Sequence, residues 1–282
     1  MVYLVFDLDA TIANVGSVIF LLQDLTASTW TSTNIPVNSE LNFKLKYAYK
    51  LFVSKIANLE QNSSTRIGIL RPGILEVMEI AKFLMENDMC SGVIIYSNNC
   101  SLNCLEFIRD VIHTCLSTVN LIKDCIHRFN NLRLDISGNN YTNNNFKKTW
   151  NSLRNLLVNG KAKAPGSIDP SQVLFFDDNL HENLIDNLRE NYIHVSPYTY
   201  NIPWVKIEEI YRATIKESQL INFEFIKFIN KFNQNKVTTV GEHLHYYKMR
   251  YLLIREHQDS ENPPLPDSSI NLMLLALQNK FL

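Results

Sequence analysis

A short apolar segment near the start of the chain runs directly into two carboxylates, and this feature most constrains the fold. Residues 2–6 are rich in β-branched and aromatic side chains, which is typical of a buried strand. Asp7 and Asp9 lie two positions apart, so they project to the same side at its carboxyl end. Ligands collect at the carboxyl ends of parallel strands. Two buried like charges need a proton or a cation, and oxygen ligands favour a hard ion such as Mg²⁺.

The composition is that of an ordinary globular protein and excludes several classes. The 282 residues are 46% hydrophobic and 20% charged, with a formal net charge of −1. A chain with so small a net charge has no overall electrostatic attraction for nucleic acid or for a membrane surface, so neither partner is expected. A strand beginning at residue 2 argues against a signal peptide, and no apolar stretch approaches the roughly 18 residues of a membrane span. We therefore expect an intracellular protein, cytoplasmic or nuclear and not secreted, whose five cysteines are reduced and mostly buried.

Strand and helix patterns alternate along the chain, which predicts an α/β fold with a parallel sheet. Besides the first strand, strands are expected at Ile67–Leu70, Val93–Tyr96, Leu132–Ile136, Val173–Phe176 and Tyr192–Val195. Helices are expected at Glu40–Glu60, Ile74–Met85, Leu102–Leu116, Phe146–Leu157, Glu182–Arg189, 204–232 and 269–282. The rest of the stretch 117–145 is polar and is expected to be irregular.

We divide the chain between residues 232 and 233. Residues 1–232 are expected to form a Rossmann-like core, with 12–66 as an insertion or cap-like segment after the first strand. Residues 233–282 are expected to form a helical C-terminal extension that docks on the core or on a partner protein and is dispensable for turnover. A break at Pro263–Pro266 precedes its last helix. Near the start of this extension, His243 lies among aromatic residues, which favours a partly exposed aromatic surface over a zinc site.

Three of the predicted strands end in polar residues. The first ends at Asp7 and Asp9, another at Ser97, and a later one at the pair Asp177-Asp178. Right-handed crossovers bring all these ends to one edge of a parallel sheet. Lys148, on the helix that precedes the last of these strands, supplies a cation. A nucleophilic Asp, a second Asp, a hydroxyl, a Lys and an acidic pair around Mg²⁺ are the parts required for phosphoryl transfer through an aspartyl-phosphate.

These motifs resemble those of the haloacid-dehalogenase superfamily. Within it, they are similar to the phosphatases that act on the carboxyl-terminal domain of RNA polymerase II, with their small-phosphatase and nuclear-LIM-interactor-like relatives. The resemblance covers roughly residues 1–230, and the Arg71-Pro72-Gly73 turn narrows the superfamily to this family. The matching segments are Asp7-Leu-Asp9-Ala-Thr11, Leu70-Arg71-Pro72-Gly73, Ile95-Tyr96-Ser97, Phe146–Leu153 and Val173–Asn179.

The resemblance implies a role for each matched residue. Asp7 would be the nucleophile, and Asp9 the acid that protonates the leaving oxygen and the base that activates water. Lys148 would bridge Asp7 and the phosphate. The implied phosphate-binding residues are Thr11, Ser97, Asn98 and Lys148, and the implied Mg²⁺ ligands are Asp7, Asp9, Asp177 and Asp178.

The chain departs from the family pattern at two positions. The family usually has Glu where this chain has Ala10, and Thr where it has Ser97. Ser keeps the hydroxyl, and Ala10 lies outside the set of implied ligands, so neither change argues against catalysis. Arg71 is expected to be a structural anchor or salt-bridge partner rather than a substrate contact.

The resemblance implies a Mg²⁺-dependent protein serine/threonine phosphatase that hydrolyses phosphoric monoesters of phosphoserine or phosphothreonine. Two alternatives stay open. An ordered lid formed by residues 12–66 would favour a small-molecule or nucleic-acid phosphate ester as the substrate. The asparagine-rich composition suits a large DNA virus, and insect-virus relatives of this fold take part in nucleocapsid assembly, which is the second alternative.

Overall fold

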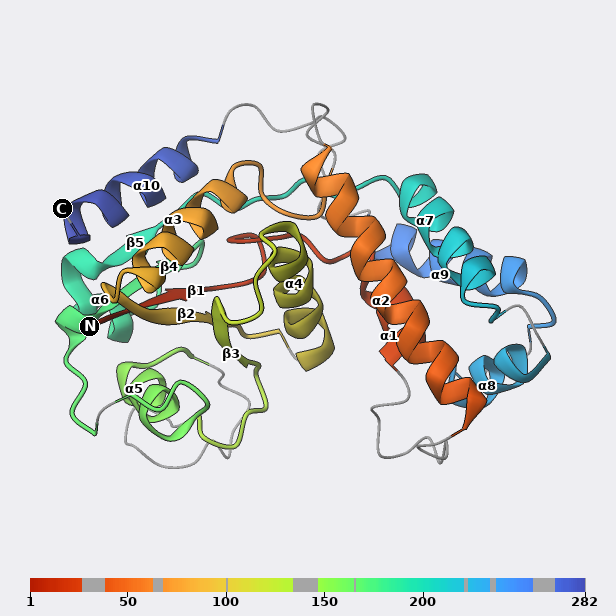
Figure 1. Ribbon diagram of the computed structural model, residues 1–282, viewed down its shortest axis with the longest axis horizontal. Helices are drawn as coiled ribbons and strands as arrows, with labels where there is room; N and C mark the ends of the chain where they lie inside the picture. The colour runs from red at the N-terminus through yellow and green to blue at the C-terminus, as the bar shows by residue number, and fades with distance from the viewer. Residues whose placement is uncertain are drawn as a thin grey trace. The chain divides into compact units, whose positions relative to one another are not determined.

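The computed structural model describes residues 1–26, 39–62, 68–99, 101–133, 147–164, 166–220, 223–233, 237–255 and 267–281. Within these residues, one all-parallel sheet has the strand order β3-β2-β1-β4-β5 (Figure 1). Its strands are β1 (Val2–Phe6), β2 (Cys90–Tyr96), β3 (Ile122–Ile126), β4 (Val173–Asp177) and β5 (Tyr192–His194). This confirms the predicted α/β class with a Rossmann-like parallel sheet.

The chain divides into two units, each built from separated segments. The first, here called the sheet unit, comprises residues 1–14, 70–198 and 264–282. The second, the helical unit, comprises residues 15–69 and 199–263. The continuous division at residues 232 and 233 stays a prediction.

Helices cover both faces of the sheet in the sheet unit. They are α3 (Ile74–Glu86), α4 (Leu102–Cys115), α5 (Trp150–Asn159), α6 (Glu182–Leu188) and α10 (Ser268–Phe281). Helices α5 and α6 pack on the face that carries Val5, Tyr96 and Phe175. Helices α3 and α4 contact β2 and β3, and Figure 1 shows α3 and α5 on opposite sides of the strands. The sheet is therefore doubly wound.

The strand order reverses between β1 and β4, which is a topological switch point. From β1 the chain moves outward to β2 and β3, and it then returns to place β4 and β5 on the other side of β1. Doubly wound sheets bind ligands outside the carboxyl ends of their strands at this point. Asp7 follows β1, and its N–H donates to the carbonyl of Phe176 in β4 at 2.9 Å. The two acidic motifs are therefore neighbours in space.

Strand β3 lies in a stretch that we expected to be irregular. Lys123 and Asp124 interrupt its apolar pattern, so the sequence did not signal a strand. Lys123 is exposed, as an edge strand permits, whereas the buried Asp124 accepts hydrogen bonds from the N–H groups of Cys125 and Lys161. The strand predicted at Leu132–Ile136 is wrong at its start, because Leu132 lies in a turn.

Several other predicted boundaries differ from the structure or fall where it gives no description. Leu70 forms only an isolated bridge with Ala13, and helix α5 begins at Trp150 rather than at residue 146. Positions 67, 134–136, 146 and 263–266 lie outside the described residues. Four of the cysteines are buried with free thiols, as expected, and position 100 also lies outside that part. None of the helices in the described ranges is long and apolar enough to cross a membrane.

The helical unit contains α1 (Ile19–Thr26), α2 (Glu40–Gln61), α7 (Trp204–Glu217), α8 (Phe223–Asn233) and α9 (Val240–Arg255). Helix α2 confirms the amphipathic helix predicted at this position, and it begins where the Ser39 hydroxyl accepts the N–H of Asn42 at 3.2 Å. The single helix predicted over 204–232 is wrong, because Gln219 has a φ of 56° and interrupts it. Helix α9 lies within the segment predicted to be a helical extension, but the sequence did not give its bounds.

A buried carboxylate joins three helices of this unit. Oδ2 of Asp24, on α1, accepts the hydroxyl of Tyr211 at 3.1 Å and lies 2.7 Å from Nε2 of His243. Its Oδ1 accepts the hydroxyl of Tyr247 at 2.8 Å. The side chains of Asp24 and His243 are completely buried. The predicted partly exposed surface at His243 is therefore wrong, because Asp24 gives the imidazole a polar partner inside the core.

The last helix docks on its own unit. Its Ser269 hydroxyl accepts the N–H of Ser196 at 3.1 Å, and Lys280 donates to Asn191 at 2.6 Å. Gly73 has a φ of 87°, and a Cβ built there would lie 3.0 Å from Ile270 of α10. Glycine suits this backbone conformation and also gives the helix room to approach. Removal of α10 would therefore expose part of α3.

Replacement of Asp24 tests the buried network. We expect Asp24→Ala to lower the free energy of unfolding by about 3–5 kcal/mol, because it removes the shared acceptor of three buried donors. Urea unfolding followed by circular dichroism measures this loss. Exposed Glu209 on α7 provides the control, and Glu209→Ala should change stability by no more than about 0.5 kcal/mol. A loss below about 1 kcal/mol for Asp24→Ala would contradict the role given to the network.

Candidate active site

A buried arginine holds the loop that follows β1. The Arg71 guanidinium donates to the carbonyl of Ala10 at 2.6 Å and to that of Ser196, and it lies 3.3 Å from Asp267. Ala10 has a φ of 58°, a left-handed conformation that costs energy for a residue with a Cβ. These contacts confirm the predicted structural role of Arg71, and they fix the turn just after Asp7.

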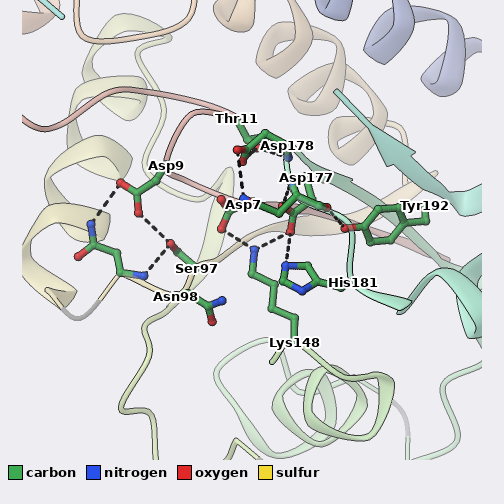
Figure 2. Close-up of polar contacts among 12 residues, drawn as sticks. Asp7, Asp9, Thr11, Ser97, Asn98, Lys148, Asp177, Asp178, His181 and Tyr192 are labelled. Atoms are coloured by element: carbon green, nitrogen blue, oxygen red, sulfur yellow. Dashed lines mark hydrogen bonds and ion pairs between the residues drawn. The ribbon is translucent and has the colours of Figure 1, made fainter. Parts of the chain in front are cut away.

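Lys148 bridges the carboxylates at the ends of two neighbouring strands. Its Nζ lies 2.6 Å from Oδ1 of Asp7 and 2.6 Å from Oδ2 of Asp177 (Figure 2). All three side chains are buried. Lys148 was predicted to lie on a helix, but it precedes α5, whose N-cap is Thr149. The cap sets the direction of the chain immediately after the lysine.

Asp178 lies beside this bridge. Its Oδ1 accepts the hydroxyl of Thr11 at 3.0 Å, and the same hydroxyl accepts the N–H of Asp178 at 3.0 Å. One carboxylate oxygen from each of Asp7, Asp177 and Asp178 lies within 4.8 Å of the others. The structure thus brings together three of the four predicted metal ligands, and it places Thr11 against one of them. The donors are all oxygens, which suits a hard cation such as Mg²⁺.

The carboxylate of Asp9 points away from this trio, toward the end of β2 (Figure 2). Its Oδ2 accepts the hydroxyl of Ser97 at 3.3 Å, and its Oδ1 accepts Nδ2 of Asn99 at 3.3 Å. The N–H of Asn99 in turn donates to the Ser97 hydroxyl at 3.0 Å. The structure therefore places Asp9 with a predicted phosphate-binding residue rather than in the acidic trio.

Four residues at the site were missed by sequence reasoning, and Asn99, which donates to Asp9, is one of them. Arg133 donates to Oδ1 of Asn98 at 2.9 Å, and Nε2 of His181 lies 3.4 Å from Oδ2 of Asp177. The hydroxyl of Tyr192 donates to the carbonyl of residue 179, directly after the acidic pair. Neither Arg133 nor Tyr192 belongs to a recognisable motif, whereas the spacing of His181, four residues after Asp177, could have indicated it.

The site holds more negative charge than its lysine can balance. Burial raises the pKa of Asp7 to about 8, an effect that Lys148 opposes and Asp177 strengthens. Burial also raises the pKa values of Asp9 and Asp178. Burial alone would raise the pKa of Asp177, but the charge of Lys148 and the hydrogen bonds from Lys148 and His181 outweigh this effect and hold the pKa below its ordinary value. A divalent cation at the trio would supply the missing positive charge, so the residues fit a Mg²⁺ site.

No protein-family model and no curated protein sequence matches this chain. Among solved structures, the chain is similar to a Had-superfamily hydrolase from Ehrlichia chaffeensis. The sequences are 18% identical, and the match covers 76% of this chain and 97% of that chain with a TM-score of 0.30.

Substitution of Asp7 tests the charge imbalance in metal-free protein. An unfolded aspartate has a pKa of about 3.9, so the folded state with its raised pKa binds the proton more tightly. Wild-type stability should therefore fall as the pH rises from about 4 to about 8. Asp7→Asn removes this loss, and it should be more stable than wild type at pH 8 by about 2–5 kcal/mol, with a smaller gain at pH 5.

Unfolding midpoints in EDTA at both pH values measure this effect. The exposed Asp186 on α6 provides the control, since Asp186→Asn should not change the pH dependence. Added Mg²⁺ should reduce the difference between Asp7→Asn and wild type at pH 8. An equal difference at pH 5 and pH 8 would refute the charge imbalance at Asp7.

Proposed function

We propose that this chain is a Mg²⁺-dependent phosphatase that forms an aspartyl-phosphate on Asp7, with a phosphoserine or phosphothreonine protein as its substrate. The observation that carries the proposal is the bridge from Lys148 to Asp7 and Asp177 at the switch point of the sheet. Asp178 next to it completes an all-oxygen trio. The motif resemblance supports the substrate class.

Asp7 is the nucleophile of the proposed reaction. Among the described residues, Lys148 bonds only one of its oxygens, Oδ1, so Oδ2 keeps its lone pairs for attack on phosphorus. The attack forms an O–P bond to Asp7 and breaks the P–O bond to the leaving alcohol. Lys148 offsets the charge of the carboxylate, which lowers the repulsion between Asp7 and a phosphate dianion. A Mg²⁺ ion held by the trio would add positive charge at the phosphoryl oxygens.

Asp9 is suited to move the protons. Burial raises its pKa, so it holds a proton at a higher pH than an ordinary aspartate does. It gives this proton to the leaving oxygen in the first step. In the second step the Asp9 carboxylate takes a proton from water, the water oxygen attacks the phosphorus, and phosphate leaves Asp7. In this proposal Ser97, which donates a hydrogen bond to Asp9, also contacts a phosphoryl oxygen during both steps.

A small-molecule phosphate ester is the second candidate substrate. The predicted insertion 12–66 contributes two helices to a separate helical unit, together with residues from 199–263. In the superfamily that the motifs resemble, members with small substrates close an ordered cap over the site, so closure of this unit over the acidic trio would favour such a substrate. The protein partner at the C-terminal helices remains part of the proposal for the first candidate.

Turnover tests the chemistry that the two candidates share. We expect Asp7→Asn to lower kcat on p-nitrophenyl phosphate by about 10³-fold or more, because the substituted amide is not a nucleophile. EDTA should abolish the wild-type activity, Mg²⁺ should restore it, and beryllofluoride, which mimics a phosphoryl group on a carboxylate, should inhibit it. Activity of Asp7→Asn within tenfold of wild type would end the aspartyl-phosphate assignment.

A substrate panel distinguishes the candidates. Phosphoserine and phosphothreonine peptides should give a kcat/KM at least about tenfold above that of nucleotides and sugar phosphates, since a peptide offers additional binding contacts. Asp7→Asn serves as the background control for every substrate. A preference for a nucleotide or a sugar phosphate would reject the protein substrate in favour of the second candidate.

A further inference from the structure

Arg133 is a buried cation beside the candidate site. Its side chain is only 1% exposed. Among the described residues no carboxylate lies within ion-pair distance of its guanidinium. Its Nε is buried and has no hydrogen-bond acceptor there. Burial of a charge without a nearby counter-charge lowers the stability of the folded protein, and a bound anion would offset this loss.

Three consecutive residues at the end of β2 hold the guanidinium. It lies over the ring of Tyr96 at 4.8 Å, donates to the carbonyl of Ser97 at 3.3 Å, and donates to Oδ1 of Asn98 at 2.9 Å. Nζ of Lys148 lies 5.7 Å from the centre of the same ring. One aromatic ring therefore contacts both the cation of the acidic site and the cation at the end of β2.

Arg71 provides a comparison within the same unit. It is equally buried and also holds backbone carbonyls, but Asp267 lies 3.3 Å from it and balances its charge. Among the described residues, the partners of Arg133 are neutral and belong to the segment that carries Ser97 and Asn98. Both of these residues were predicted to bind phosphate. The charge of Arg133 is therefore available to an anion at this segment.

We propose that Arg133 is a positioning residue that makes the end of β2 selective for a phosphoryl dianion. It fixes the backbone at Ser97 and the side chain of Asn98, and its uncompensated charge favours an anion next to them. This inference rests on the proposed function, because that function places the phosphoryl group at this edge of the sheet. It adds a specificity-determining residue that acts through its neighbours rather than on the reacting atoms.

Binding of inorganic phosphate tests the inference without turnover. Wild type, Arg133→Met and Arg133→Lys are titrated with phosphate in the presence of Mg²⁺ by isothermal calorimetry. Loss of the charge-assisted contacts should weaken phosphate binding by about 10- to 100-fold in Arg133→Met. Arg133→Lys keeps the charge but cannot donate to Ser97 and Asn98 together as the guanidinium does, so it should bind phosphate with intermediate affinity. Arg154, exposed on α5, supplies the control Arg154→Met, which should bind as wild type does.

Kinetics and melting temperatures separate a positioning role from a structural one. Arg133→Met should raise KM for p-nitrophenyl phosphate in parallel with the loss of phosphate affinity, with a smaller change in kcat. Unchanged phosphate affinity in Arg133→Met overturns the inference, even if its melting temperature falls. If Arg133→Met does not fold, wild-type affinity in Arg133→Lys overturns it instead.

The same titration keeps this inference distinct from the proposed function. Phosphate binding that depends on Arg133, in a protein without Asp7-dependent turnover, supports the anion site and rejects the phosphatase. Turnover that depends on Asp7 but not on Arg133 supports the phosphatase and rejects the anion site at Arg133. Absence of phosphate binding in wild type overturns the Arg133 inference directly.

Discussion

Three carboxylates and one lysine share the buried space where β1 and β4 end, and this excess of negative charge governs the sheet unit. Lys148 can balance only part of it, and burial, with the charge of Asp177 nearby, raises the pKa of Asp7 to about 8. The surrounding structure holds the acids in place. Arg71 fixes the turn after β1, Thr11 binds Asp178, and the strand pairing sets β1 directly beside β4. An arrangement that keeps like charges together at a cost in stability is typical of a functional site.

In the helical unit, by contrast, a buried carboxylate is surrounded by hydrogen-bond donors. Asp24 has donors from Tyr211, Tyr247 and His243, and its network supplies hydrogen bonds rather than excess charge. Such a satisfied group specifies how helices pack and has no need of a ligand. The contrast with Asp7 gives a physical criterion for separating structural from functional acids in this chain. The same criterion separates Arg71, which is paired with Asp267, from Arg133.

The parts of the site that are contiguous with apolar strands could be predicted from the sequence. Asp7 and Asp177 each complete a strand of strong β character, so their meeting follows from the parallel topology. Arg133 and His243 could not be predicted, because each depends on a partner brought close only by tertiary packing. The sequence pattern also did not predict where the carboxylate of Asp9 points. Alternation places it on the side of Asp7, but the turn after β1 directs its carboxylate to Ser97.

Each unit is completed by segments close to the end of the chain, which bears on how the protein folds during synthesis. His243 and Tyr247 lie 219 and 223 residues after their partner on α1. Ile270, which packs against the turn at Gly73, is made later still. A ribosome releases the N-terminal end first, so the apolar side of α1 emerges long before its final partners do. In a nascent chain shorter than about 240 residues, neither unit can therefore be complete. During this time the apolar side of α1 remains exposed and is available to chaperones.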